Sequence, residues 1–395
     1  MSRLRLVGIR TLTVVVLLVT FELVLKHGFG YGWWTVNEKS ERYGWVMLPD
    51  QEAKSRDLRV EEHINSLGFR DREWAPPRRG PDGGWLKDGS LFRVAVLGNS
   101  MTFGTSVPIE QVFSRDVEDR IGAELKRRGD PRTALGMNFA VQGYCLEQSA
   151  RVYEDVVRPY RPDLLVVPLH PQDVQPMKPA ADDTEWGLRR WVMRTATYDL
   201  LLRNVINRWM PPVPLDAEAR SKVREWELIE DSLKQRPFAK DNHGFFETAG
   251  QRLDQVVELA REDGTRMVLV YLPAWRKHFQ PEVRNADTYF TPWATRHKGE
   301  VLEANPWPEF QRQMKPVIDE IAAKGMPGGT THDLTTLSWT DEQGRTHRGD
   351  ELETGELSLH LLDDFGHLTA KGHAVIAQAI FDSVMKAGLL DGRDH

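Results

Sequence analysis

A serine lies directly after an apolar run, in a segment whose glycines suit a tight turn. The run LFRVAVLG (91–98) is typical of a buried parallel strand, and Asn99, Ser100 and, four residues later, Gly104 follow it. Open α/β sheets bind ligands at the carboxyl ends of their strands, so Ser100 occupies a position suited to a nucleophile. The segment is not a G-x-S-x-G elbow, because Thr102 stands at the second glycine position. Taken alone, it is equally compatible with a serine that caps a helix.

An aspartate and a histidine stand three residues apart near the C-terminus, where Asp364 and His367 lie in LLDDFGHLTAKGH. A serine hydroxyl needs a base to take its proton at neutral pH, and imidazole has a suitable pKa. The imidazole in turn needs a carboxylate that fixes its tautomer and stabilises the imidazolium. Taken alone, however, the pattern is better explained by Asp363 and Asp364 as caps of the last helix.

Apolar runs alternate with helical patterns across the region that joins these residues. The expected strands are 91–98, 134–141, 163–169, 267–273 and a short one near 332–334, and the expected helices are 114–129, 146–157, 249–263, 308–324 and 374–388. Such alternation indicates a doubly wound α/β sheet. We therefore predict a three-layer α/β/α sandwich with about five parallel strands in the flavodoxin-like style.

The remaining segments divide the chain around this domain, which we expect over residues 91–390. Residues 1–28 are expected to form a signal anchor, and residues 29–90 a polar linker with a lead-in segment. Within that linker, PPRRGPDGG (76–84) predicts a loop just ahead of the main domain. Residues 176–245 break the alternation of strands and helices, so we expect a helical insertion there, packed over the sheet edge or over the site.

The N-terminus carries a membrane signal. Thr11 to Leu25 are almost entirely apolar, they follow three arginines, and no small-x-small cleavage site comes after them. This pattern predicts an uncleaved, single-pass transmembrane helix over about residues 6–26. Its basic end would lie in the cytoplasm, and the catalytic domain would be extracytoplasmic or periplasmic. The alternative is an amphipathic helix that holds a cytoplasmic lipid esterase on the membrane surface, and VVVLLV, apolar all round, argues against it.

Charge and cysteine content narrow the classes of partner and site. The formal net charge is −6 and no long basic run is present, which argues against nucleic acid as a partner. Cys145 is the only cysteine, so neither an intrachain disulfide nor a zinc site built from thiolates is possible.

Taken together, the serine block and the D-x-x-H block resemble the signatures of the SGNH (GDSL-like) hydrolase family. The resemblance covers roughly residues 91 to 390, and INSLGFRDRE (64–73) looks like the lead-in segment of many bacterial members. It implies that Ser100 is the nucleophile and that Asp364 and His367 are the acid and base of the triad. The implied oxyanion hole uses the N–H groups of Ser100 and of Gly143, which follows Asn138 in NFAVQGY.

The chain departs from the family pattern at two positions. Asn99 replaces the acid of a GDS-type block, and that acid is not itself part of the triad. The third block normally ends in an Asn-Asp pair whose Asn side chain donates to the oxyanion. Here the strand runs into HPQD, so that Gln172, with the same amide on a longer stem, becomes the expected third donor. We expect the neighbouring His170 to be structural.

These residues predict a serine esterase without a metal or organic cofactor. By resemblance to anchored bacterial members, its substrate would be an O-acyl, often acetyl, ester of an envelope or exported polysaccharide, or an acylated small molecule. An O-acyltransferase with the same triad is one alternative. A binding protein with the same fold and weakened catalysis is the other, and Asn99 and Gln172 are the features that favour it.

Overall fold

The structure is a computed structural model of the 395-residue chain. It describes residues 3–29, 31–32, 35–55, 60–178, 195–201, 221–222, 224–225, 227–229, 232–233, 242–273, 286–324, 338–340, 346–348 and 367–391. Asp364 and the strand expected near 332–334 lie outside the described residues, as does most of the expected insertion. The chain forms two compact units, Met1–Gly68 with Pro179–Val223, and Phe69–Lys178 with Arg224–His395.

The first unit combines an apolar helix with small antiparallel hairpins. Its elements are α1 (Arg3–Leu23), η1 (Val24–Gly28), β1 (Asn37–Ser40), β2 (Gly44–Met47), β3 (Gln51–Lys54), β4 (Glu61–Ile64) and α6 (Ala196–Leu201). Strand β1 pairs with β2, and β3 pairs with β4. The stretch Val7–Gly28 is long and apolar enough to cross a membrane, close to the expected span of 6–26.

A carboxylate near the end of α1 caps the short helix α6. The Glu22 side chain accepts hydrogen bonds from the backbone N–H groups of Ala196 and Thr197, the latter at 3.0 Å, and from the Thr197 hydroxyl at 2.8 Å. The first N–H groups of a helix have no partner within the helix, so an acceptor at this position satisfies them. A second link joins the same segments, because the Asp199 carboxylate accepts the Gly32 N–H at 2.7 Å.

The second unit is built on one parallel sheet. Its strands are β5 (Leu91–Val96), β6 (Thr133–Asn138), β7 (Leu164–Leu169), β8 (Arg266–Tyr271) and β9 (Val301–Ala304). They lie in the order β6-β5-β7-β8-β9, which is the 2-1-3-4-5 order of flavodoxin-like folds. Val96 at the end of β5 pairs with Asn138 at the end of β6 and with Val166 in β7. The loops after these three strands therefore emerge side by side.

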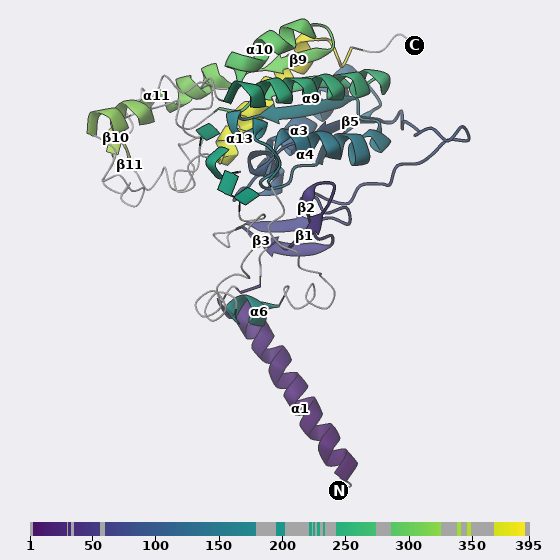
Figure 1. The fold of residues 1–395 in the computed structure, drawn as a ribbon, viewed down its shortest axis with the longest axis vertical. Helices are drawn as coiled ribbons and strands as arrows, with labels where there is room; N and C mark the ends of the chain where they lie inside the picture. The colour runs from purple at the N-terminus through teal and green to yellow at the C-terminus, as the bar shows by residue number, and fades with distance from the viewer. Residues whose placement is uncertain are drawn as a thin grey trace. The chain divides into compact units, whose positions relative to one another are not determined.

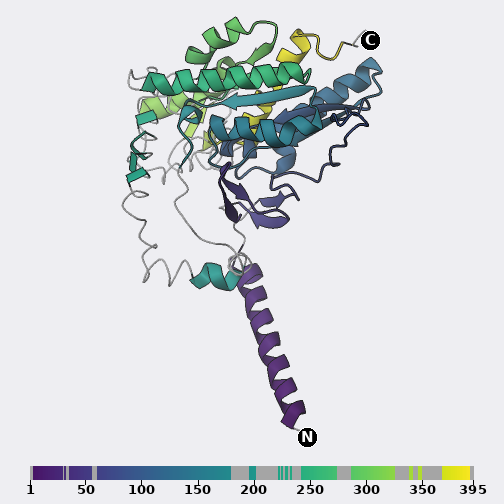
Figure 2. The same ribbon diagram turned by 45° about the vertical axis from the view of Figure 1, so that its right-hand side comes forward.

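Helices cover both faces of this sheet. They are α2 (Ser100–Phe103), η2 (Ile109–Gln111), α3 (Phe113–Arg128), α4 (Leu146–Val152), η3 (Tyr153–Val157), η4 (Arg158–Tyr160), η5 (Pro171–Val174), α9 (His243–Glu262), α10 (Asp287–Arg296), α11 (Trp307–Lys324) and α13 (Ala370–Lys386). Helices α3, α11 and α13 share one apolar cluster with the sheet, whereas α4 and α9 pack together outside it (Figure 1 and Figure 2). All six residues of β7 are buried, as a strand covered on both faces requires.

The α/β/α architecture is therefore the one expected, and the differences concern the smaller elements. The edge strand β9 and helix α10 had no counterpart among the sequence expectations. Strands β1 to β4 lie in the segment 29–90, which was expected to be a polar linker with a lead-in segment. The two-stranded pair β10 (Ser338–Thr340) and β11 (Thr346–Arg348) was also not expected.

Candidate active site

Ser100 opens helix α2 directly beyond the central strand β5. The chain leaves β5 through Gly98, whose φ of 144° favours glycine and whose added Cβ would clash with the side chain of Thr102. Asn99 is the N-cap residue, and its side-chain oxygen accepts the Met101 N–H at 2.8 Å. The tight turn therefore places Ser100 at the first helical position, at the carboxyl end of the strand.

The loop after β6 lies along this serine turn. The backbone N–H of Val141 donates to the Gly98 carbonyl at 3.1 Å, and the Gln142 side chain donates to the Thr105 hydroxyl at 3.3 Å. Gly143, with φ of 78°, is an exposed turn residue of the same loop. Glycine suits this position because the left-handed conformation carries no Cβ penalty there.

Asn138 fixes the start of that loop from inside the core. Its side chain is buried, donates to the Thr102 carbonyl at 3.1 Å and accepts the Ala140 N–H at 3.1 Å. Because Thr102 belongs to α2, this one amide links the end of β6 to the helix that carries Ser100. The expectation that Asn138 belongs to the site region is consistent with these contacts.

The loop after β7 is tied to the serine turn through a buried carboxyl group. Asp173 is 7% exposed, and it accepts the Asn99 side-chain N–H at 2.5 Å and the His170 backbone N–H at 2.8 Å. Burial raises the pKa of Asp173 to about 7, although both hydrogen bonds favour the ionised form. The His170 ring accepts the Gln172 N–H at 3.3 Å and so caps the short helix η5.

Three candidate oxyanion donors thus sit on the loops after neighbouring strands. They are the backbone N–H groups of Ser100 and Gly143 and the side-chain amide of Gln172. Within the part of the chain that the structure describes, none of these three groups makes a hydrogen bond, and neither does the Ser100 hydroxyl. Groups that stabilise a developing negative charge must be available to the substrate, so this set is chemically suited to that role.

His367 lies just before the last helix. It is half-buried, and it is followed by the core residue Leu368 and by Thr369, whose hydroxyl caps α13 by accepting the Gly372 N–H at 3.2 Å. Asp364, its expected partner, lies outside the described residues. The pairing of His367 with Asp364 and with Ser100 stays a prediction.

A second histidine fastens the same helix to the domain. His373 is buried in α13, stacks on Phe113 and accepts the Phe113 N–H at 3.3 Å through Nδ1. Burial, together with the nearby charges of Arg70 and His367, lowers the pKa of His373 to about 3. His373 is therefore a neutral structural acceptor, which distinguishes it from the candidate base six residues earlier.

Sequence reasoning gave no role to three charged residues at this end of the sheet. Asp173 bridges two site loops, and Arg70 and Asp71 bind the backbone of α2 and of β6. The only sequence signal was their position, in the lead-in segment and in the HPQD block. Among the described residues, no group of three or more His, Cys, Asp or Glu side chains is arranged to hold a metal ion.

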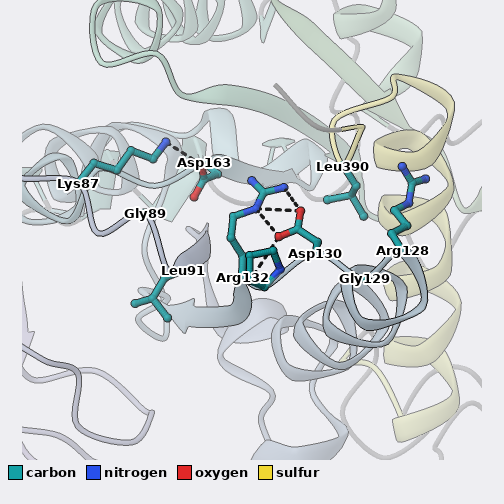
Figure 3. Close-up of a pocket in the computed structure, with 10 residues that line it drawn as sticks. Lys87, Gly89, Leu91, Arg128, Gly129, Asp130, Arg132, Asp163 and Leu390 are labelled. Atoms are coloured by element: carbon teal, nitrogen blue, oxygen red, sulfur yellow. Dashed lines mark hydrogen bonds and ion pairs between the residues drawn. The ribbon is translucent and has the colours of Figure 1, made fainter. Parts of the chain in front are cut away.

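A charged cavity lies at the opposite, amino end of the sheet. Most of its lining residues precede β5, β6 or β7, and two ion pairs lie among them (Figure 3). Lys87 contacts Asp163 at 2.7 Å, and Arg132 contacts Asp130 at 2.6 Å. Because ligands of open α/β sheets bind at the carboxyl ends of strands, we assign this cavity a structural role.

Comparison with known proteins finds resemblance only at the level of structure. No family model matches the chain, and no curated protein matches it. A two-domain esterase active on acetylated mannans has 13% identity and a TM-score of 0.37, over 76% of this chain and 50% of that one. TesA has 11% identity and a TM-score of 0.34, over 75% of this chain and 99% of TesA. A mutant of Axe2, an acetyl-xylooligosaccharide esterase from Geobacillus, has 13% identity and a TM-score of 0.38, over 77% and 97%. Values this low assign no activity to this chain by themselves.

Proposed function

We propose that this protein is a serine ester hydrolase of the SGNH type, with Ser100 as nucleophile. The observation that carries the proposal is the placement of Ser100 on the central strand's loop, between the loops that hold Gly143 and Gln172. The Asn99–Asp173 and Val141–Gly98 hydrogen bonds join these three loops. A nucleophile flanked by available donors is the arrangement that acyl transfer needs.

In the first half of the reaction, the Ser100 oxygen attacks the ester carbonyl carbon while His367 takes the hydroxyl proton. The carbonyl oxygen becomes an oxyanion, which the N–H groups of Ser100 and Gly143 and the Gln172 amide stabilise. When the intermediate collapses, the carbon–oxygen bond to the alcohol breaks and His367 returns the proton to that alcohol. Asp364 orients His367 and stabilises its cationic form.

The second half repeats these steps with water. His367 removes a proton from water, the hydroxide attacks the acyl-serine, and the acid leaves as Ser100 regains its proton. If a sugar hydroxyl instead of water accepted the acyl group from Ser100, the same site would act as an acyltransferase. An assay that follows both free acid and acylated acceptor separates the two reactions.

The anchor helix supports an extracytoplasmic substrate. Three arginines, at positions 3, 5 and 10, precede or begin the apolar stretch, so the positive-inside rule puts the N-terminus in the cytoplasm. The domain then faces the cell envelope, where O-acetylated polysaccharide is a suitable ester. A reporter fused to the C-terminus tests this orientation, because activity of a cytoplasm-dependent reporter there would contradict it.

The decisive experiment is covalent labelling of the full-length protein in detergent with a fluorophosphonate probe. The native protein should label, whereas Ser100→Ala and His367→Ala should not. Ser90→Ala is the matched control, because Ser90 lies at the other end of the same strand and bonds to Asp88. Its labelling should equal that of the native protein.

Absence of labelling in a native protein that is shown to be folded would overturn the proposal. It would favour instead the binding protein that Asn99 and Gln172 had raised as an alternative. Labelling that persists in Ser100→Ala would place the reactive nucleophile elsewhere in the chain.

A further inference from the structure

A buried arginine holds the end of the helix that carries Ser100. Arg70 is 1% exposed, and its guanidinium donates to the carbonyls of Phe103 at 2.9 Å, Gly104 at 2.5 Å and Val107 at 2.7 Å. It also lies over the Phe103 ring, with 5.2 Å between Cζ and the ring centroid. Two nitrogens of one planar group thus bind three carbonyls that follow Ser100 within seven residues.

Two of these carbonyls lie at the C-terminal end of α2, those of Phe103 and of the C-cap residue Gly104, and the third, that of Val107, lies in the turn that follows. The last carbonyls of any helix have no partner within it, and α2 has only four residues, so its own hydrogen bonds cannot hold it. The helix ends at Gly104, with φ of 79°, where an added Cβ would clash with Val112. The position of Ser100 therefore depends on contacts from outside the helix, and Arg70 provides two to the helix end and one to the turn that follows.

The next residue holds the neighbouring loop in the same way. Asp71 is 3% exposed and accepts the Asn138 N–H at 2.9 Å, while its other oxygen accepts from Arg115. Strand β6 is an edge of the sheet, so the Asn138 N–H on its outer side has no neighbouring strand. Asp71 therefore fixes the residue whose own side chain binds the Thr102 carbonyl and from which the Gly143 loop begins.

We propose that the Arg70–Asp71 dipeptide is a positioning element of the active site. Arg70 sets the Ser100 helix, and Asp71 sets the end of β6 that leads to Gly143. This inference rests on the proposed function, because positioning has meaning only if Ser100 reacts. Neither residue contacts a substrate directly in this scheme, so both act through the backbone of other residues.

The first test removes the planar guanidinium group of Arg70. Arg70→Lys keeps a positive charge but replaces a planar fork with a single ammonium group, which cannot reproduce the same three bonds. Displacement of a nucleophile by about 1 Å can lower a rate on the order of 100-fold. We expect the maximal labelling rate of Arg70→Lys to fall by about 10–100-fold, with little change in the probe concentration that gives half of that rate.

The matched control is Arg93→Lys. Arg93 lies in β5 and also donates to a backbone carbonyl, that of Tyr160 at 3.1 Å, but it lies toward the amino end of the strand. Labelling should be measured on full-length proteins in detergent, well below the unfolding temperature of each. Hydrogen exchange of the peptide 98–107 should accelerate in Arg70→Lys and stay unchanged in Arg93→Lys. A merely structural role would lower the unfolding temperature without changing the labelling rate.

The outcomes separate the two proposals. If the native protein labels and folded Arg70→Lys labels at the native rate, the positioning inference is wrong while the esterase proposal stands. If the native protein does not label, the esterase proposal fails and the inference fails with it. Should Arg70→Lys not fold, Asp71→Asn provides the same test, because an amide of equal size cannot accept from both Asn138 and Arg115. Native-rate labelling by Asp71→Asn would then overturn the inference.

Discussion

Carboxylates at the two ends of the parallel sheet have pKa values shifted in opposite directions. At the amino end, Asp130 is partly buried, and the hydrogen bond from Arg132 lowers its pKa below the usual value. At the carboxyl end, burial raises the pKa of Asp71 to about 6 and that of Asp173 to about 7. At the amino end, Asp130 and Asp163 form ion pairs with Arg132 and Lys87. At the carboxyl end, Asp173 accepts from two amide groups, and Asp71 accepts from the Asn138 N–H as well as from Arg115.

This difference indicates what each end contributes. An ion pair that solvent partly reaches, such as Arg132–Asp130, adds little to stability. Buried carboxylates are costly to desolvate, so they persist where their hydrogen bonds determine a structure that matters. Here the two buried groups hold the backbone and side chains around Ser100. Asp163 at the amino end is also buried, but the two carboxylates whose pKa burial raises lie at the end of the sheet where we propose that the chemistry takes place.

The largest effect is expected from the removal of a proposed oxyanion donor at the carboxyl end of the sheet. Gln172→Ala should lower the rate of ester hydrolysis by about 10²–10³-fold, because removal of one oxyanion donor has that effect in other acyl-transfer enzymes. Steady-state hydrolysis of an activated acetyl ester by the full-length protein measures it. Gln172→Asn, which keeps the amide on a shorter stem, should retain more activity than Gln172→Ala. Unchanged activity in Gln172→Ala would mean that the hole uses backbone donors alone.

A second prediction removes the buried bridge between two site loops. Asp173→Ala leaves the Asn99 amide and the His170 N–H without their acceptor, so we expect a loss of about 1–3 kcal/mol in the free energy of unfolding. Labelling should also slow, because Asn99 caps the serine helix. Asp130→Ala at the amino end is the matched control and should not change the labelling rate. Equal slowing in both variants would remove the distinction between the two ends.

The pH dependence of stability should sharpen the same contrast. The pKa of folded Asp173, about 7, lies above the ordinary value of 3.8, so the folded state holds its proton over that range. Its contribution to stability is present below pH 4 and is lost as the pH rises through 7. Asp173→Asn removes this loss. Between pH 5 and pH 8, the free energy of unfolding of the native protein should therefore fall by roughly 2–3 kcal/mol relative to that of the variant.

Denaturant unfolding at the two pH values measures that difference. Asp130→Asn provides the comparison, because the lowered pKa of Asp130 keeps it ionised in both states above pH 5. Its difference from the native protein should therefore stay constant between pH 5 and pH 8. If the free energy of unfolding of the native protein increased with pH relative to that of Asp173→Asn, the assigned direction of the Asp173 pKa shift would be wrong.

The smallest effect is expected from the cavity at the amino end. Lys87→Met removes the ion pair with Asp163 but keeps most of the apolar stem, and Asp163 still accepts the Arg93 N–H at 2.9 Å. We expect a change of about 1 kcal/mol or less in the free energy of unfolding. Labelling by the fluorophosphonate probe should not change. A loss of labelling would show that this cavity influences the reactive serine.

The sequence predicted the central strands well because β5, β7 and β8 are buried on both faces and read as continuous apolar runs. It missed β9, since four residues at a sheet edge, one of them the polar Glu303, carry neither a long run nor a clear alternation. The short hairpins β1–β2 and β3–β4 were missed for a similar reason, because their strands are four residues long and all but β2 are mainly polar.

At the candidate site, the residues that we propose to carry chemistry were predicted from the sequence, whereas the residues that hold them in place were not. Ser100 and Gly143 stand in recognisable blocks after apolar runs. Arg70 and Asp71 lie in a charged stretch that resembles an exposed turn, and their burial results from tertiary packing against α2 and β6. A sequence pattern carries no sign of which carbonyl a distant guanidinium will bind.

The hydrogen bonds between Glu22 and helix α6 give the proposed membrane anchor a second, structural role. A simple tether could be exchanged for any other apolar helix, but this one supplies the acceptor for the first N–H groups of α6. Proteolytic release just beyond residue 28 would therefore leave α6 uncapped as well as detaching the protein. The shed and the anchored forms would then differ in local structure, and not in location alone.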